Sequence, residues 1–143
     1  MMHNYSLQRF IEAQEKSYSM AYSEITNGKK RTHWMWYIFP QIQGLGISDM
    51  SKLYAITDIQ EAVEFLNHPL LGRRLVRICV ELLNIESNDA HAIFGSPDDL
   101  KLHSSMTLFS SVPAADPVFE KVLNRFFSGK KDKKTLNILE EAH

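Results

Sequence analysis

The residues best suited to chemistry form one stretch, KKRTHWMWYIFPQ, at positions 29–41. Lys30, Arg31 and His33 could hold a phosphate group, because lysine supplies a point charge and a guanidinium binds two oxygens at once. The alternative is a solvated turn in which these cations follow the C-terminus of a helix and complement its dipole. The sequence leaves both interpretations open.

Aromatic side chains follow these cations directly. Trp34, Trp36 and Phe39 cannot all point the same way over six residues, so some must fill the core. The others could line a pocket, or all of them could pack in the core and at its rim. A ring exposed in such a pocket could stack a planar base, which is worth about 1–3 kcal/mol per base. We expect Gln14 and Gln41 to orient the same ligand, although a buried Gln14 could equally pair with backbone groups.

A second group of polar residues lies in SPDDLKLHSSMTLF, at positions 96–109. Asp99 is the candidate general base of this group. Lys101, Ser104 and Ser105 are candidate ligand contacts. In the alternative interpretation, the carboxylate complements the first turn of a helix, and the hydroxyls bond to carbonyls one turn back.

The elements that must position these residues are predicted to be helices. Apolar side chains recur at a spacing of 3.6 residues over 6–26, and Asn27–Gly28 ends that pattern. Residues 33–39 fit a short helix that Pro40 ends. Later helix starts are predicted from capping residues and first-turn prolines: Ser48, Asp58 with Glu61, Asn67 or His68 before Pro69, Ser96 before Pro97, Asp116 before Pro117, and Asp132.

These patterns predict an all-α protein, a single domain over residues 1–143, with an irregular bundle of about seven to eight helices. No strand is required anywhere. The helix that follows Pro69 has an apolar stripe from Leu71 to Leu82, so we expect it to be central. Cys79 lies within this stripe and is expected to be an inert core thiol.

Length, charge and cysteine content narrow the class of protein. A net charge of -1 over 143 residues argues against a dedicated nucleic-acid binder, so single-stranded nucleic acid at Lys29–Arg31 is the least favoured function. One cysteine, no signal-peptide pattern and no apolar run of about 20 residues predict a cytoplasmic protein with no membrane partner. The spacing of the histidines predicts no metal site, and no cofactor is expected. The sequence does not predict the oligomeric state.

The chain closely resembles a widespread bacterial family known only as domain of unknown function 1810, over about residues 4–138. This resemblance implies an all-helical fold and no established activity. It is carried by the stretches RFIEAQ, HWMWYIFPQIQGLG, FLNHPLLGRRL, IFGSPDDLKLHSSMTLF and DPVFEKVLNRFFSG.

A more distant resemblance is to the YbiA-like (NADAR) family, which handles ADP-ribose and related N-glycosides and cleaves a base from ribose phosphate. Gln8 stands where that family has a glutamate, and Phe94 stands where it has a tryptophan before glycine, so a shared ligand type does not imply a shared reaction. The residues that carry the similarity are Ala13, Gln14, His68, Pro69, Leu75, Phe94 and Gly95.

Two classes of function are therefore compatible with the sequence. The first is a small-molecule site for a nucleotide or an ADP-ribose-like compound, with N-glycoside hydrolysis as its reaction. The second is a noncatalytic protein-interaction module that uses exposed aromatic side chains rimmed by charge. The first hypothesis requires Gln14, Trp36 and Asp99 to converge on one pocket.

Overall fold

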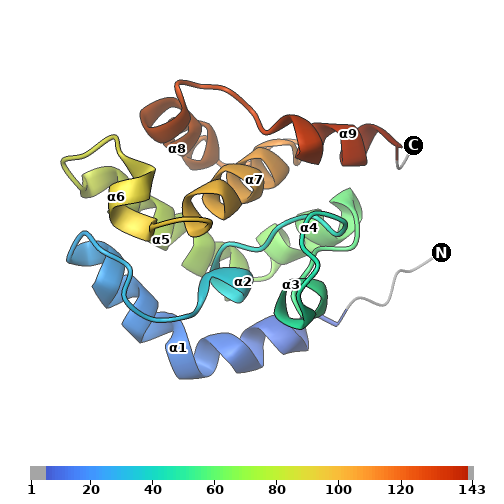
Figure 1. Cartoon of the computed structure of the whole chain (residues 1–143). Helices are drawn as coiled ribbons and strands as arrows, with labels where there is room; N and C mark the ends of the chain where they lie inside the picture. The colour runs from blue at the N-terminus through green and yellow to red at the C-terminus, as the bar shows by residue number, and fades with distance from the viewer. Residues whose placement is uncertain (1–5, 142–143) are drawn as a thin grey trace.

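This computed structural model describes residues 6–141, which contain nine α-helices joined by loops and no strand (Figure 1). The prediction of an all-α bundle is confirmed. The helix that sequence reasoning missed is α6, which Asp89 caps by accepting a hydrogen bond from the Ala92 amide at 3.1 Å. The helices are α1 (Gln8–Thr26), α2 (Met35–Ile38), α3 (Asp49–Leu53), α4 (Ile59–Asn67), α5 (Leu71–Asn84), α6 (Ala90–Phe94), α7 (Asp98–Ser110), α8 (Val118–Phe127) and α9 (Lys133–Glu141).

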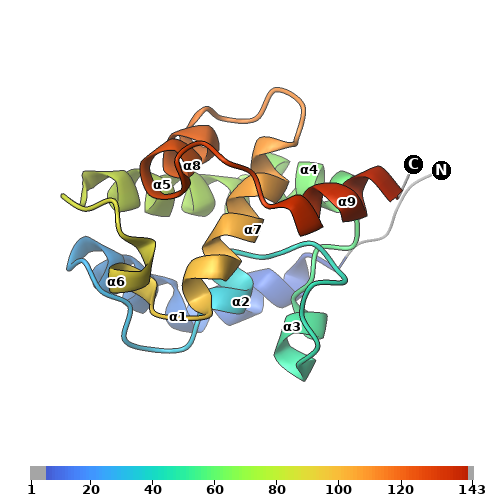
Figure 2. The same cartoon turned by 45° about the horizontal axis from the view of Figure 1, so that its top comes forward.

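The helices pack around two central elements, α5 and α7 (Figure 2). Helix α5 packs against α1, α4 and α8 through the predicted stripe from Leu71 to Leu82. Helix α7 packs against α4, α6, α8 and α9, and every residue from Ser104 to Phe109 is buried. The central position predicted for α5 is therefore shared with α7. Cys79 is buried on α5, and burial raises the pKa of its thiol.

Most predicted helix starts are confirmed by the capping contacts. Ser48 and Asp58 accept hydrogen bonds from amides three residues later, at 3.1 and 2.9 Å. Asp116 accepts from the Val118 amide at 2.9 Å, and Asp132 accepts from the Thr135 amide at 3.3 Å. Short polar side chains thus satisfy amides that the helices leave unpaired.

Two helix starts differ from the prediction. Helix α5 begins at Leu71, two residues later than predicted, but the predicted cap is present: Nδ1 of the His68 ring accepts hydrogen bonds from the Leu70 and Leu71 amides. Ser96 does not cap α7, which begins at Asp98. The Gly95 carbonyl accepts the Asp99 amide there, at 2.9 Å. Within residues 6–141, no helix combines the length and apolar character needed to cross a bilayer.

Candidate ligand-binding site

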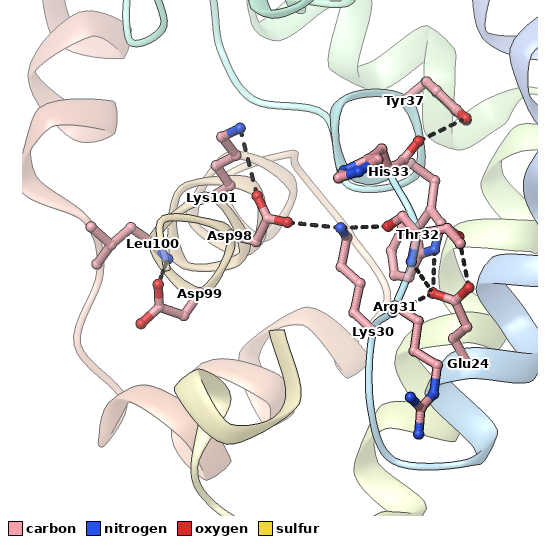
Figure 3. A network of polar contacts seen from close by, with 11 residues as sticks. Glu24, Lys30, Arg31, Thr32, His33, Tyr37, Asp98, Asp99, Leu100 and Lys101 are labelled. Atoms are coloured by element: carbon pink, nitrogen blue, oxygen red, sulfur yellow. Dashed lines mark hydrogen bonds and ion pairs between the residues drawn. The ribbon is translucent and has the colours of Figure 1, made fainter. Parts of the chain in front are cut away.

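The loop between α1 and α2 folds around a carboxylate of the chain itself (Figure 3). Glu24 is 6% exposed, and its Oε1 accepts hydrogen bonds from the Arg31 amide (2.7 Å), the Thr32 amide (3.0 Å) and Trp34 Nε1 (2.9 Å). The Thr32 hydroxyl donates to Oε2 at 2.6 Å. Burial raises the pKa of Glu24, but these hydrogen bonds outweigh it and lower the pKa to about 2. An internal anion therefore occupies these donors.

Lys30 is also engaged within the chain. Its side chain is 7% exposed, and Nζ lies 2.9 Å from Asp98 Oδ2 and donates to the Thr32 carbonyl at 2.6 Å. The same ammonium lies 5.1 Å from the centre of the Trp34 ring. The Lys30 ammonium is therefore already paired within the chain, and a phosphate at the predicted contact would have to displace Asp98. Arg31 and His33 lie exposed on this loop, and neither side chain makes a hydrogen bond or ion pair with a described residue.

The predicted aromatic platform divides between the core and its edge. Trp34 is 1% exposed and Phe39 is fully buried, and both rings contact Phe94. A base cannot stack on either ring, so this expectation is wrong for Trp34 and Phe39. Trp36 is half-buried, and the Lys101 ammonium lies 5.2 Å from the centre of its ring.

Three other predicted residues lie away from any shared pocket. Gln14 is buried and donates to the Tyr37 carbonyl at 2.8 Å, which is the backbone pairing that the alternative interpretation predicted. Ser105 is completely buried inside α7, and its hydroxyl has no hydrogen-bond partner among the described residues. Asp99 points away from Lys30 (Figure 3). Its Oδ2 lies 3.5 Å from Nδ1 of His91. Gln14, Trp36 and Asp99 therefore do not converge.

The residues that do come together line a groove of about 300 Å³ between the 41–51 segment, α7 and α9, which we call the α7–α9 groove. Three predicted site residues line it, namely Gln41, Lys101 and Ser104. Lys101 also connects it to the Lys30 loop, because Asp98 lies 3.6 Å from Lys101 and 2.9 Å from Lys30 (Figure 3). Sequence reasoning did not select three further lining residues: His103, Asp132 and Lys134.

One cation of the groove has no internal partner, although the groove also contains the carboxylate of Asp132. Lys134 is exposed and makes no hydrogen bond or ion pair with any described residue. Asp132 accepts from the hydroxyls of Ser104 (2.9 Å) and Thr135 (2.6 Å). Burial raises the pKa of Asp132, but these hydrogen bonds outweigh it and lower the pKa. His103 Nε2 donates to the Lys130 carbonyl at 2.8 Å.

A larger cavity of about 580 Å³ adjoins the groove and shares Gln41, Gly46 and Ser51 with it. Partly buried Arg9 and buried Glu61 form a structural ion pair in its lining, because they lie 3.1 Å apart and Glu61 is 1% exposed. Arg9 also donates to the carbonyls of Leu53 and Ala55. This network joins α1 to α4 and to the segment between α3 and α4.

Comparison with known proteins gives a family but no activity. A family model described as "Protein of unknown function (DUF1810)" matches residues 4–139. The crystal structure of the conserved hypothetical protein Rv1873 from Mycobacterium tuberculosis is similar, with 40% sequence identity and a TM-score of 0.91. The match covers 94% of this chain and 96% of that chain. No curated protein matches the chain.

Proposed function

We propose that this chain, which belongs to the DUF1810 family of proteins of unknown function, binds a small phosphate-bearing ligand in the α7–α9 groove. One observation carries this proposal: the groove is lined by two lysines, and Lys134 has no partner among the described residues. Lys101 and Lys30 both pair with Asp98, but the Lys101 ammonium lies farther from it, at 3.6 Å against 2.9 Å for Lys30. A phosphate is the kind of group that ammonium groups lining one groove attract.

The size of the groove indicates a ligand of mononucleotide size. Its volume of about 300 Å³ lies at the small end of the range for ligand pockets, about 300–1,000 Å³. The amide of Gln41 and the hydroxyl of Ser51 line the same groove and could bond to ribose hydroxyls. A larger ADP-ribose-like compound would need the adjoining cavity of about 580 Å³ as well.

The proposal is limited to binding and does not include N-glycoside hydrolysis. Asp99, the candidate general base, does not line the groove and faces His91. Gln14 and His68 carry the resemblance to YbiA-like proteins, yet both use their polar atoms within the chain. Asp132 lines the groove, but the hydrogen bonds that hold it as a helix cap favour its ionised form and oppose proton uptake.

A protein-interaction module is the second candidate function. Trp34 cannot anchor a partner because it is buried. Aliphatic side chains near the groove are exposed instead, with Ile47 at 91% and Leu100 at 61%. Self-association that disappears in an Ile47→Ser/Leu100→Ser variant, measured by analytical ultracentrifugation, would favour this module over a ligand site.

A thermal-shift comparison tests the ligand proposal. A ligand that binds only the folded chain stabilises it, by about 2.7 kcal/mol at 100 times its Kd. We expect AMP and inorganic pyrophosphate to raise the Tm, and adenosine, which has no phosphate, to raise it less. Lys101→Gln and Lys134→Gln should each weaken AMP binding about fivefold, since a solvent-exposed ion pair is worth up to about 1 kcal/mol.

The matched control is Lys16→Gln, which removes an exposed lysine from α1, a helix that does not line the groove. This variant should bind AMP as the unchanged protein does. Millimolar AMP that leaves the Tm unchanged would contradict the proposal, and so would equal AMP affinity in the Lys134→Gln variant.

A further inference from the structure

A separate cavity of about 510 Å³ lies between the junction of α4 with α5 and the connection from α7 to α8. Val76, Val112 and Phe119 give it an apolar lining, and Val112 and Phe119 are buried. Arg73 and Arg77 line the same cavity and are exposed, so they stand at its mouth. This cavity and the α7–α9 groove have no lining residue in common.

Backbone packing forms two walls of this cavity. At the α4–α5 junction, a Cβ atom on Gly72 would lie 2.0 Å from the Leu66 carbonyl oxygen, so only glycine permits this close approach. On the opposite wall, the chain turns at Ala114, whose φ is 59°, in the left-handed region. The Ala115 amide donates to the Val112 carbonyl at 3.2 Å across this turn. The hollow is thus part of the folded architecture.

The two arginines at the mouth of the cavity form no ion pair with a described residue. Arg73 makes no hydrogen bond or ion pair with a described residue. The Arg77 guanidinium lies 5.6 Å from the centre of the Tyr22 ring and has no carboxylate partner among those residues. The two arginines are four residues apart on α5 and therefore share a face. Asp116 also lines the cavity, so one carboxylate accompanies the two guanidinium groups; its Oδ1 accepts the Val118 amide at 2.9 Å.

We propose that this cavity binds an amphipathic carboxylate, a small molecule with an apolar body and one carboxylate head. The apolar body would lie against Val76 and Phe119, where burial removes it from water. The head would meet Arg73 and Arg77 at the mouth, because a guanidinium binds both oxygens of a carboxylate. A neutral apolar compound would fill the hollow but would offer no oxygens to the two guanidinium groups. This site is independent of the proposed phosphate ligand.

Decanoate is a suitable probe because it joins an apolar chain to one carboxylate. In a titration followed by ¹⁵N amide NMR, we expect the shifts to concentrate in residues 66–77 and 112–119. Decanol has the same chain without the charge, so it should bind about tenfold more weakly. Decanoate shifts confined to the α7–α9 groove, or equal affinities for the two compounds, would overturn the proposal.

Variants of the two arginines test the role of the charges. The Arg73→Gln/Arg77→Gln variant should lose about tenfold in decanoate affinity and retain its affinity for decanol, which shows that the cavity is intact. The Arg73→Lys/Arg77→Lys variant keeps both charges and should bind decanoate more tightly than the glutamine variant. The matched control, Arg31→Gln, removes an exposed arginine elsewhere and should change neither affinity. Equal decanoate binding by the lysine and glutamine variants would contradict the inference.

Discussion

Replacement of Glu24 by glutamine removes a buried charge while leaving its hydrogen-bonding geometry available. The glutamine oxygen can take the place of Oε1 and accept from the Arg31 amide, the Thr32 amide and Trp34 Nε1. The glutamine NH2 can donate to the Thr32 hydroxyl, which donates to Oε2 in the unchanged protein. The substitution therefore isolates the contribution of the negative charge from that of the contacts.

The pKa of Glu24 gives the size of that contribution. Its pKa is lowered on folding from 4.5 to about 2. At about 1.4 kcal/mol for each pKa unit, the ionised form stabilises the native state by about 3 kcal/mol at pH 7. Because the folded pKa is the lower one, this stabilisation is complete above the unfolded pKa and is lost as the pH falls towards 2. About 1.5 kcal/mol should remain at pH 3.

Urea denaturation followed by far-UV circular dichroism measures this effect. Glu24→Gln should lower the free energy of unfolding by about 3 kcal/mol at pH 7 and by about half as much at pH 3. The matched control, Glu86→Gln, changes an exposed glutamate and should shift it by less than about 0.5 kcal/mol. A Glu24→Gln loss below about 1 kcal/mol at pH 7, or an equal loss at both pH values, would refute the reasoning.

Three further predictions concern residues placed by the same fold. Asp132→Asn should cost about 1 kcal/mol and speed hydrogen exchange in α9, because it weakens the cap on Thr135; unchanged exchange would contradict this. Trp34→Phe removes a donor to Glu24 and should cost about 1–2 kcal/mol at pH 7, with a smaller loss in a Glu24→Gln background, where the acceptor is uncharged. Equal losses would contradict the idea that the charge of Glu24 strengthens this hydrogen bond. Cys79 should react with a thiol reagent only on unfolding, since it is buried and its pKa is raised; rapid labelling of the native protein would contradict its core position.

The sequence is sufficient to predict those parts of the fold that depend on contacts between residues close together in the chain. Ser48 and Asp58 cap helices through amides three residues away, so each contact can be predicted from a short stretch. Helix α6 has five residues, too few to show an apolar period, and Asp89 was its only local signal. Serine is a common capping residue, but Ser96 does not cap α7. The Asp99 amide instead donates a hydrogen bond to the Gly95 carbonyl.

The candidate site depends on contacts that no local pattern contains. Glu24 lies on α1, and it meets the 31–34 segment only because the intervening loop turns back on the helix. Ser104 and Asp132 are 28 residues apart and meet through the packing of α7 against α9. Of the residues that the sequence prediction named, Gln41, Lys101 and Ser104 line one groove. Residue types could not show that Lys30 pairs with Asp98, whereas Lys134 has no ion-pair partner among the described residues.

An AMP titration followed by ¹⁵N amide NMR tests the central proposal most directly, because it separates the two places where cations could hold a phosphate. The proposal predicts amide shifts in residues 41–51, 100–104 and 132–134, which border the α7–α9 groove. It predicts little change in residues 29–33, where Glu24 and Asp98 already engage the loop. Shifts concentrated in residues 29–33, or no shifts at millimolar AMP, would contradict it.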